Sequence, residues 1–109
     1  MKRIKFEKIK KGDYIKAVIS DKQYKANKEA KYSDFWKSTY FQVTNISNES
    51  GTVEIETNKW TDFDDDGKYL RVLEQWDSLS TNNNCNMFFK LTEDEYRRKV
   101  GKYLIASNL

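Results

Sequence analysis

Hydrophobic and polar residues alternate most clearly in the segment 52–58, where Val and Ile are separated by Glu54 and Glu56. This alternation places the apolar side chains on one face of a β-strand and the carboxylates on the other. A β-branched run at 39–46 precedes it, and the segment between them, 47–51, ends in glycine. The pattern predicts an antiparallel hairpin.

Three further segments are rich in β-branched and aromatic residues and predict strands. They span residues 14–20, 68–76 and 87–91. The Gly-Asp pair at 12–13 precedes the first of them, and the sequence Asp-Asp-Asp-Gly at 64–67 precedes the second. Both combinations are typical of turns, because glycine accepts positive φ and aspartate bonds to its own backbone. The pattern therefore contains five strands.

A helix is predicted over about 93–105. Thr92 and Glu95 have the spacing of a capping box, and Leu91 and Tyr96 occupy the two positions of a hydrophobic staple. The apolar residues Tyr96, Val100, Tyr103 and Leu104 recur at helical spacing. This stripe is expected to pack on the sheet.

Residues 21–37 interrupt the strand pattern with a polar, lysine-rich stretch. Ser20 and Gln23 have capping-box spacing, which favours a short helix. The lysines spread over half of such a helix and leave no clean apolar stripe. The segment is therefore either a surface helix or an irregular excursion, and we expect it outside the core.

One domain over residues 1–109 fits these elements, because the length allows a single core. The fold class is mainly β (α+β). We expect a small antiparallel five-stranded barrel or curled sheet, SH3-like or OB-like, with a long polar excursion after the first strand and a C-terminal helix.

The composition argues against an enzyme. The chain has no His, only four Gly and one Cys, so the commonest general base and the glycine-rich phosphate loops are missing. The single thiol, Cys85, lies among asparagines with no cation beside it to activate it. We expect a non-enzymatic binding protein without a cofactor or a metal ion.

Charge is distributed unevenly along the chain. Residues 1–40 hold twelve Lys/Arg and five Asp/Glu, whereas residues 41–80 hold three Lys/Arg and nine Asp/Glu. If these segments stay apart after folding, the surface has two opposed electrostatic poles that steer charged macromolecules.

The basic pole contains aromatic residues between its lysines, as a surface that neutralises phosphates and stacks on bases would. The candidate binding residues there are Lys22, Tyr24, Lys25, Lys28, Lys31, Tyr32, Trp36 and Lys37. Only one arginine occurs in the first forty residues, so we expect contact with the nucleic-acid backbone rather than with base edges. A solvated loop whose rings pack back on the sheet would have the same sequence.

The acidic pole is the second candidate surface. Its binding residues are Glu54, Glu56, Asp64, Asp65 and Asp66, which suit a basic partner. Residues 62–67 also match the opening of a calcium loop, but Leu73 stands where that loop needs a bidentate glutamate. We interpret them as a turn that carries acids.

Two functions remain open. The first is a small protein, encoded by a phage or mobile element, that inhibits or modulates a host nucleic-acid-handling protein, comparable to anti-CRISPR and other anti-defence proteins in size and character only. Abundant Lys and Asn without Pro are typical of AT-rich coding sequences. The alternative is a barrel that binds DNA or RNA without sequence preference.

No signal peptide or membrane span is predicted, so we expect a cytoplasmic location, either in the cell that encodes the protein or in a host. The oligomeric state stays open.

Overall fold

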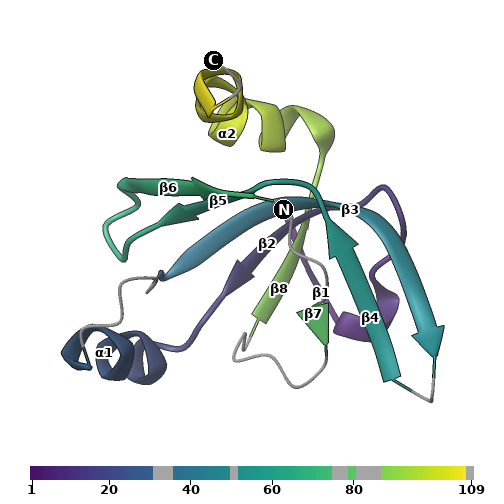
Figure 1. Ribbon diagram of the computed structural model, residues 1–109, viewed down its shortest axis with the longest axis horizontal. Coiled ribbons are helices and arrows are strands. Elements are labelled where there is room, and N and C mark those ends of the chain that lie inside the picture. The colour runs from purple at the N-terminus through teal and green to yellow at the C-terminus, as the bar shows by residue number, and fades with distance from the viewer. Residues whose placement is uncertain (31–35, 50–51, 75–78, 81–86, 108–109) are drawn as a thin grey trace.

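The computed structural model describes residues 1–30, 36–49, 52–74, 79–80 and 87–107. The elements in chain order are β1 (Lys2–Ile4), the single 3-10 turn η1 (Phe6–Lys8), β2 (Tyr14–Val18), α1 (Asp21–Glu29), β3 (Ser38–Glu49), β4 (Thr52–Thr57), β5 (Trp60–Phe63), β6 (Tyr69–Leu73), β7 (Leu79–Ser80), β8 (Met87–Leu91) and α2 (Glu93–Ser107). Figure 1 shows a curved sheet with α2 above one face and α1 at the lower left margin.

All strand pairs are antiparallel, and the strand order is β1-β8-β2-β3-β4-β7, with β5 joined to β3 and β6 joined to β5. The long strand β3 belongs to two parts of the sheet. Its first residues pair with β2 and β5, and the rest pairs with β4 after a register shift between Val43 and Asn45. A bulge of this kind bends a strand. The predicted mainly antiparallel β fold with a C-terminal helix is confirmed.

The predicted number of five strands is too low, because the described part of the chain forms a sheet of eight. The additional strands β1, β5 and β7 are only three, four and two residues long. All four residues of β5 are buried, so it shows no alternation of apolar and polar positions. Periodicity cannot detect strands of this kind.

The predicted hairpin is confirmed as β3–β4, although β3 extends to Glu49, further into the expected turn. The turn at 64–67 is also confirmed, since it joins β5 to β6. Gly67 there has φ +79°, a conformation that residues with a side chain rarely adopt.

The main core lies on the face of the sheet away from α2. It contains Phe6, Ile9, Ile15, Ala17, Phe41, Val43, Ile55, Trp60 and Phe88. Ile15 and Ala17 of β2 are fully buried, as the alternation in that strand requires. The Trp60 indole stacks on Phe41 with ring centroids 4.6 Å apart, and its N–H donates to the Thr57 hydroxyl.

The helix α2 covers a second apolar cluster on the other face, formed by Tyr40, Phe63, Leu91, Tyr96 and Val100. The predicted capping box is confirmed: the Glu95 N–H donates to Thr92 Oγ1 (3.1 Å), and the Thr92 N–H donates to Glu95 Oε1 (2.9 Å). The staple partners Leu91 and Tyr96 are both buried in this cluster. None of the helices in the described ranges is long and apolar enough to cross a membrane.

The lysine-rich segment forms the helix α1, with Ser20 Oγ accepting the Gln23 N–H at 3.1 Å. The expectation that this segment stays outside the core is wrong for Tyr24, which is buried. One aromatic ring is too little to produce an apolar stripe in the sequence, yet it is buried and its hydroxyl donates to Asp65 in the turn between β5 and β6.

The α2 cap predicts a specific acid sensitivity. The Thr92 N–H, and after it the amino terminus of Met1, hold the pKa of Glu95 below its ordinary value of 4.5. A carboxylate whose pKa is lower in the folded state stabilises that state fully above the ordinary value, and this contribution disappears as pH falls through the folded pKa. We expect Glu95→Gln to remove this part of the acid dependence in thermal melts. An ordinary Glu95 pKa in an NMR titration would contradict the expectation.

Candidate functional site

The lysines of α1 form an exposed basic row on the first candidate surface. Lys22, Lys25 and Lys28 are all exposed, and we call them the α1 lysines. Lys28 Nζ lies 6.0 Å from the centre of the Tyr24 ring. None of the three forms an ion pair with a carboxylate of the described residues.

The other members of the predicted basic surface are not equally available. Lys37 is engaged within the protein, because its Nζ donates to the Ile19 carbonyl (2.7 Å) and to Asp21 Oδ1 (2.6 Å). Trp36 is half-buried and packs against the main core. Lys31 and Tyr32 lie outside the described residues, as does Cys85, which is not a member of this surface.

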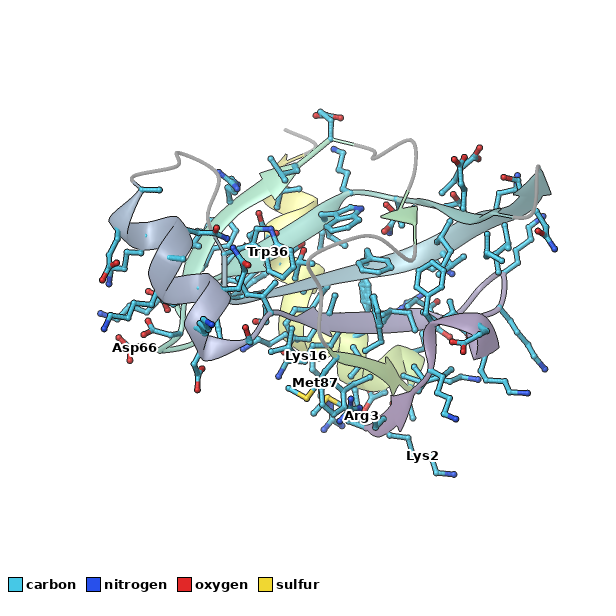
Figure 2. The ribbon with its side chains drawn as sticks, turned by 90° about the horizontal axis from the view of Figure 1, so that it is seen from below. Lys2, Arg3, Lys16, Trp36, Asp66 and Met87 are labelled. Carbon is cyan, nitrogen blue, oxygen red and sulfur yellow. The ribbon has the colours of Figure 1, made fainter. Side chains whose placement is uncertain are left out.

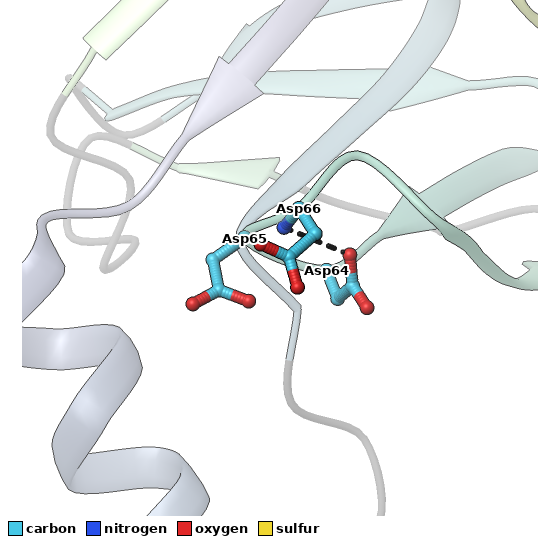
Figure 3. A group of neighbouring side chains, drawn as sticks. All are labelled: Asp64, Asp65 and Asp66. Atoms are coloured by element: carbon cyan, nitrogen blue, oxygen red, sulfur yellow. Dashed lines mark hydrogen bonds between the residues drawn. The ribbon is translucent and has the colours of Figure 1, made fainter.

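The acidic turn lies beside α1 rather than at an opposed pole. The Tyr24 hydroxyl donates to Asp65 Oδ1 at 3.2 Å, and burial raises the pKa of Tyr24. Figure 3 shows the Asp65 side chain directed towards the helix α1. The basic and acidic segments therefore meet at this point, although the contact joins the neutral Tyr24 hydroxyl to a carboxylate and not two opposite charges.

The side chain of Asp64 closes the acidic turn. Asp64 Oδ1 accepts the backbone N–H groups of Asp66 (3.0 Å) and Lys68 (2.8 Å), which closes the turn. Asp64, Asp65 and Asp66 are the only described group whose carboxylates lie close enough, within 4.8 Å, to hold a metal ion together. Asp62, the first residue of the calcium-like pattern, is buried and bound to Arg71. The turn interpretation accounts for these contacts.

Glu54 and Glu56 lie on the outer face of β4. Ile55 between them is fully buried in the main core, so the two glutamates point away from it. Glu54 is exposed and Glu56 is half-buried. In the part of the chain that the structure describes, no cation forms an ion pair with either.

A second basic surface, which the sequence analysis missed, crosses the sheet on the α2 side. The strand register places Arg3 of β1 opposite Phe89 of β8, Phe89 opposite Lys16 of β2, and Lys16 opposite Tyr40 of β3. Residues that are directly opposite on neighbouring strands point to the same face. Arg3, Phe89 and Lys16 thus form one continuous row, and Figure 2 shows Arg3, Met87 and Lys16 close together.

The helix α2 adds a further cation to this row. Lys99 Nζ lies 4.5 Å from the centre of the Phe63 ring and 5.8 Å from that of Tyr40, while Lys16 Nζ lies 5.7 Å from the Tyr40 centre. We call Arg3, Lys16, Phe89 and Lys99 the basic sheet face. The three cations form no ion pair with any carboxylate that the structure describes.

The electrostatics of the basic sheet face favour an anion. Burial lowers the pKa of Lys16, and the positive charge of Lys99 lowers it further. The protonated Lys16 is therefore partly removed from water and repelled by Lys99. A phosphate group between these cations would relieve the repulsion, and the half-buried ring of Phe89 beside them offers an apolar contact for a base. Only the register of three strands reveals the basic sheet face, since the residues that form it are far apart in the sequence.

A scan against protein-family models, a search of curated proteins and a search of solved structures each returned no match. The residues and their geometry are therefore the basis for assigning a function.

Proposed function

We propose that this protein is a non-enzymatic binding protein that holds the phosphate backbone of a nucleic acid on its basic sheet face, without sequence preference. The observation that supports the proposal is that Arg3 and Lys16 lie in one row across the sheet, with Lys99 beside Lys16 at the Tyr40 ring. None of the three cations forms an ion pair with a described carboxylate. Cations arranged in this way bind phosphates and release counterions, whereas paired surface charges do not.

A single strand fits this face better than a duplex. The Phe89 ring lies in the same row as Arg3 and Lys16, and unpaired bases can stack on such a ring while their phosphates meet the flanking cations. A duplex exposes only its backbone and groove edges to a sheet face of this kind.

The experiment is a fluorescence-anisotropy titration of a labelled single-stranded oligonucleotide at several salt concentrations. We expect binding that weakens steeply with salt. Each lost phosphate contact lowers the slope of log K against log salt by about 0.7 for single strands, so the triple variant Arg3→Gln, Lys16→Gln and Lys99→Gln should lower it by about 2. Its affinity at low salt should fall by at least about tenfold.

The α1 lysines provide a control with the same number of charges removed. The variant Lys22→Gln, Lys25→Gln and Lys28→Gln should reduce affinity less than the sheet-face variant, because its cations lie beside the acidic turn. The reverse order would move the interface to α1. If the unmodified protein binds neither DNA nor RNA at low salt, the proposed function is wrong.

The second candidate is an inhibitor of a host nucleic-acid-handling protein, encoded by a phage or mobile element. The outer face of β4 favours it, because Glu54 and Glu56 are presented there without a described cationic partner. Such a face complements the basic channel of a protein that binds nucleic acid. The same titration separates the candidates, since an inhibitor of this kind need not bind the nucleic acid itself.

We also propose that the curled sheet is a relative of the small SH3-like or OB-like barrels. The supporting features are the bend in β3, which is shared between two parts of the sheet, and the main core enclosed on the side away from α2. In barrels of this class, one curved face is used to bind ligands.

A further inference from the structure

Tyr69 of β6 and Tyr103 of α2 form a stacked pair of rings on the α2 side of the sheet. The two rings are nearly parallel, at 2°, and their centres lie 4.1 Å apart. Figure 1 shows α2 above the part of the sheet that contains β5 and β6. Tyr69 is 42% exposed. An exposed ring that the protein already holds in place can bind a ligand at little cost in conformational entropy.

The outer face of the Tyr69 ring, which points away from Tyr103, is not covered by the neighbouring ring of Phe63. The Phe63 centre lies 6.4 Å from that of Tyr69 and 5.9 Å from that of Tyr103. A ring on the outer face of Tyr69 would be farther from Tyr103 than from Tyr69, whereas Phe63 is nearer to Tyr103. Phe63 therefore packs against the side of the stack and leaves the outer face of Tyr69 for a planar ligand.

Lys99 connects the tyrosine pair to the basic sheet face. Its Nζ lies 4.5 Å from the centre of Phe63, the ring beside the pair. The same Nζ lies 5.8 Å from the centre of Tyr40, which Lys16 Nζ approaches to 5.7 Å. Lys99 and Tyr103 are four positions apart on α2, so they lie on the same side of the helix. A cation is thus placed between the two groups of rings, where it can bind a phosphate.

We propose that the Tyr69–Tyr103 pair is a second stacking position for a nucleic acid, and that the ligand is a single strand long enough to reach it from the basic sheet face. This inference rests on the proposed function. One base of the strand stacks on Phe89 and another stacks on the outer face of Tyr69, while Lys99 contacts a phosphate between them.

The strand order sets the length of this ligand. Phe89 belongs to β8 and Tyr69 to β6, and the order β8-β2-β3-β5-β6 separates them by four steps between neighbouring strands. At about 4.8 Å for each step, the two rings lie about 19 Å apart along the sheet. A stacked strand advances about 3.4 Å per nucleotide, so about six nucleotides cover this span. A mononucleotide or a dinucleotide is too short to reach both rings.

The acidic turn favours a base over a phosphate at Tyr69. Asp64 and Asp66 belong to the turn that comes just before Tyr69, and Asp66 is exposed. Their carboxylates repel a phosphate, whereas the stacking of a base on a ring adds no charge beside them. The path of the strand therefore ends at Tyr69.

The test compares Tyr69→Ser with the unmodified protein by fluorescence anisotropy, with two labelled probes. One probe is a single-stranded oligonucleotide of about eight nucleotides, and the other is the same backbone without bases. We expect Tyr69→Ser to weaken binding of the oligonucleotide by about fivefold or more, the usual contribution of one stacked base. Binding of the abasic backbone should stay within about twofold, because its phosphates still meet the cations of the basic sheet face.

Two variants are controls for the loss of the ring. Tyr69→Phe retains a ring and should bind both probes as the unmodified protein does. Ile105→Ser removes another exposed apolar side chain, which is 68% exposed. Ile105 is two positions from Tyr103 and so lies on nearly the opposite side of α2, and its loss should change neither affinity. Circular dichroism checks that each variant folds.

The salt dependence separates lost stacking from a displaced helix. Tyr69→Ser should leave the slope of log K against log salt unchanged, whereas a shift of α2 that removed Lys99 from the strand would lower it by about 0.7. A lower slope, an equal loss for both probes, or no loss for the oligonucleotide overturns the second stacking position and leaves the proposed function standing. An unmodified protein that binds neither probe overturns both.

Discussion

Replacing Trp60 with alanine is expected to lower the free energy of unfolding by about 3–5 kcal/mol, the usual cost of removing a buried aromatic ring. Trp60 is among the largest fully buried side chains, and it stacks on Phe41 at 4.6 Å. Its N–H donates to the Thr57 hydroxyl, so the substitution also leaves that buried hydroxyl without its indole partner. Urea denaturation followed by circular dichroism measures the loss.

A more conservative change separates packing from hydrogen bonding. Trp60→Phe retains a ring that can stack on Phe41 but removes the N–H donor, so its loss should be clearly smaller than that of Trp60→Ala. Equal losses for the two variants would mean that the hydrogen bond to Thr57 dominates. A loss below about 1 kcal/mol for Trp60→Ala would contradict the packing of the main core, because fully buried aromatics do not cost so little.

Asp62→Ala is expected to cost about 3 kcal/mol, because it removes one partner of a buried ion pair. The Asp62 side chain is 0% exposed and Arg71 is 26% exposed, so the guanidinium that remains is only partly hydrated. The two residues are direct cross-strand partners on β5 and β6. Thermal and urea denaturation measure the change in the free energy of unfolding.

Asp66→Ala is the matched control for the loss of one carboxylate. Asp66 is exposed in the neighbouring turn, where its backbone rather than its side chain donates to Asp64, so the change should stay within about 0.5 kcal/mol. Combining Asp62→Leu with Arg71→Met should recover much of the stability, because replacing a whole buried pair by apolar groups is often neutral. A double variant that is less stable than Asp62→Ala would show that the pair has a further structural role.

The elements with a strong local pattern were predictable. Glu54 and Glu56 alternate with buried residues in β4, and Thr92 with Glu95 begins α2, both as the sequence indicates. The strand β5 was missed, since each of its four residues is buried and Asp62 resembles a turn residue. The burial of the Asp62 carboxylate depends on its ion pair with Arg71, which belongs to another strand. A local pattern contains no information about such a partner.

The candidate site was predictable only in part. The exposed α1 lysines follow from composition, because lysine is rarely buried. The contact between Tyr24 and Asp65 joins residues 41 positions apart, so no local pattern indicates it. The basic sheet face depends on the register between β1, β8 and β2, so Arg3 and Phe89 gave no sign of proximity in the sequence.

The sequence by itself determined the class of this protein: a small, mainly β chain with a capped C-terminal helix and no histidine for catalysis. These properties follow from periodicity, capping and composition, which act over a few neighbouring residues. Tertiary structure alone decided which charges meet and which stay unpaired. Strand register joins residues from opposite ends of the chain, and that register is set by the burial of a whole face rather than by any local segment.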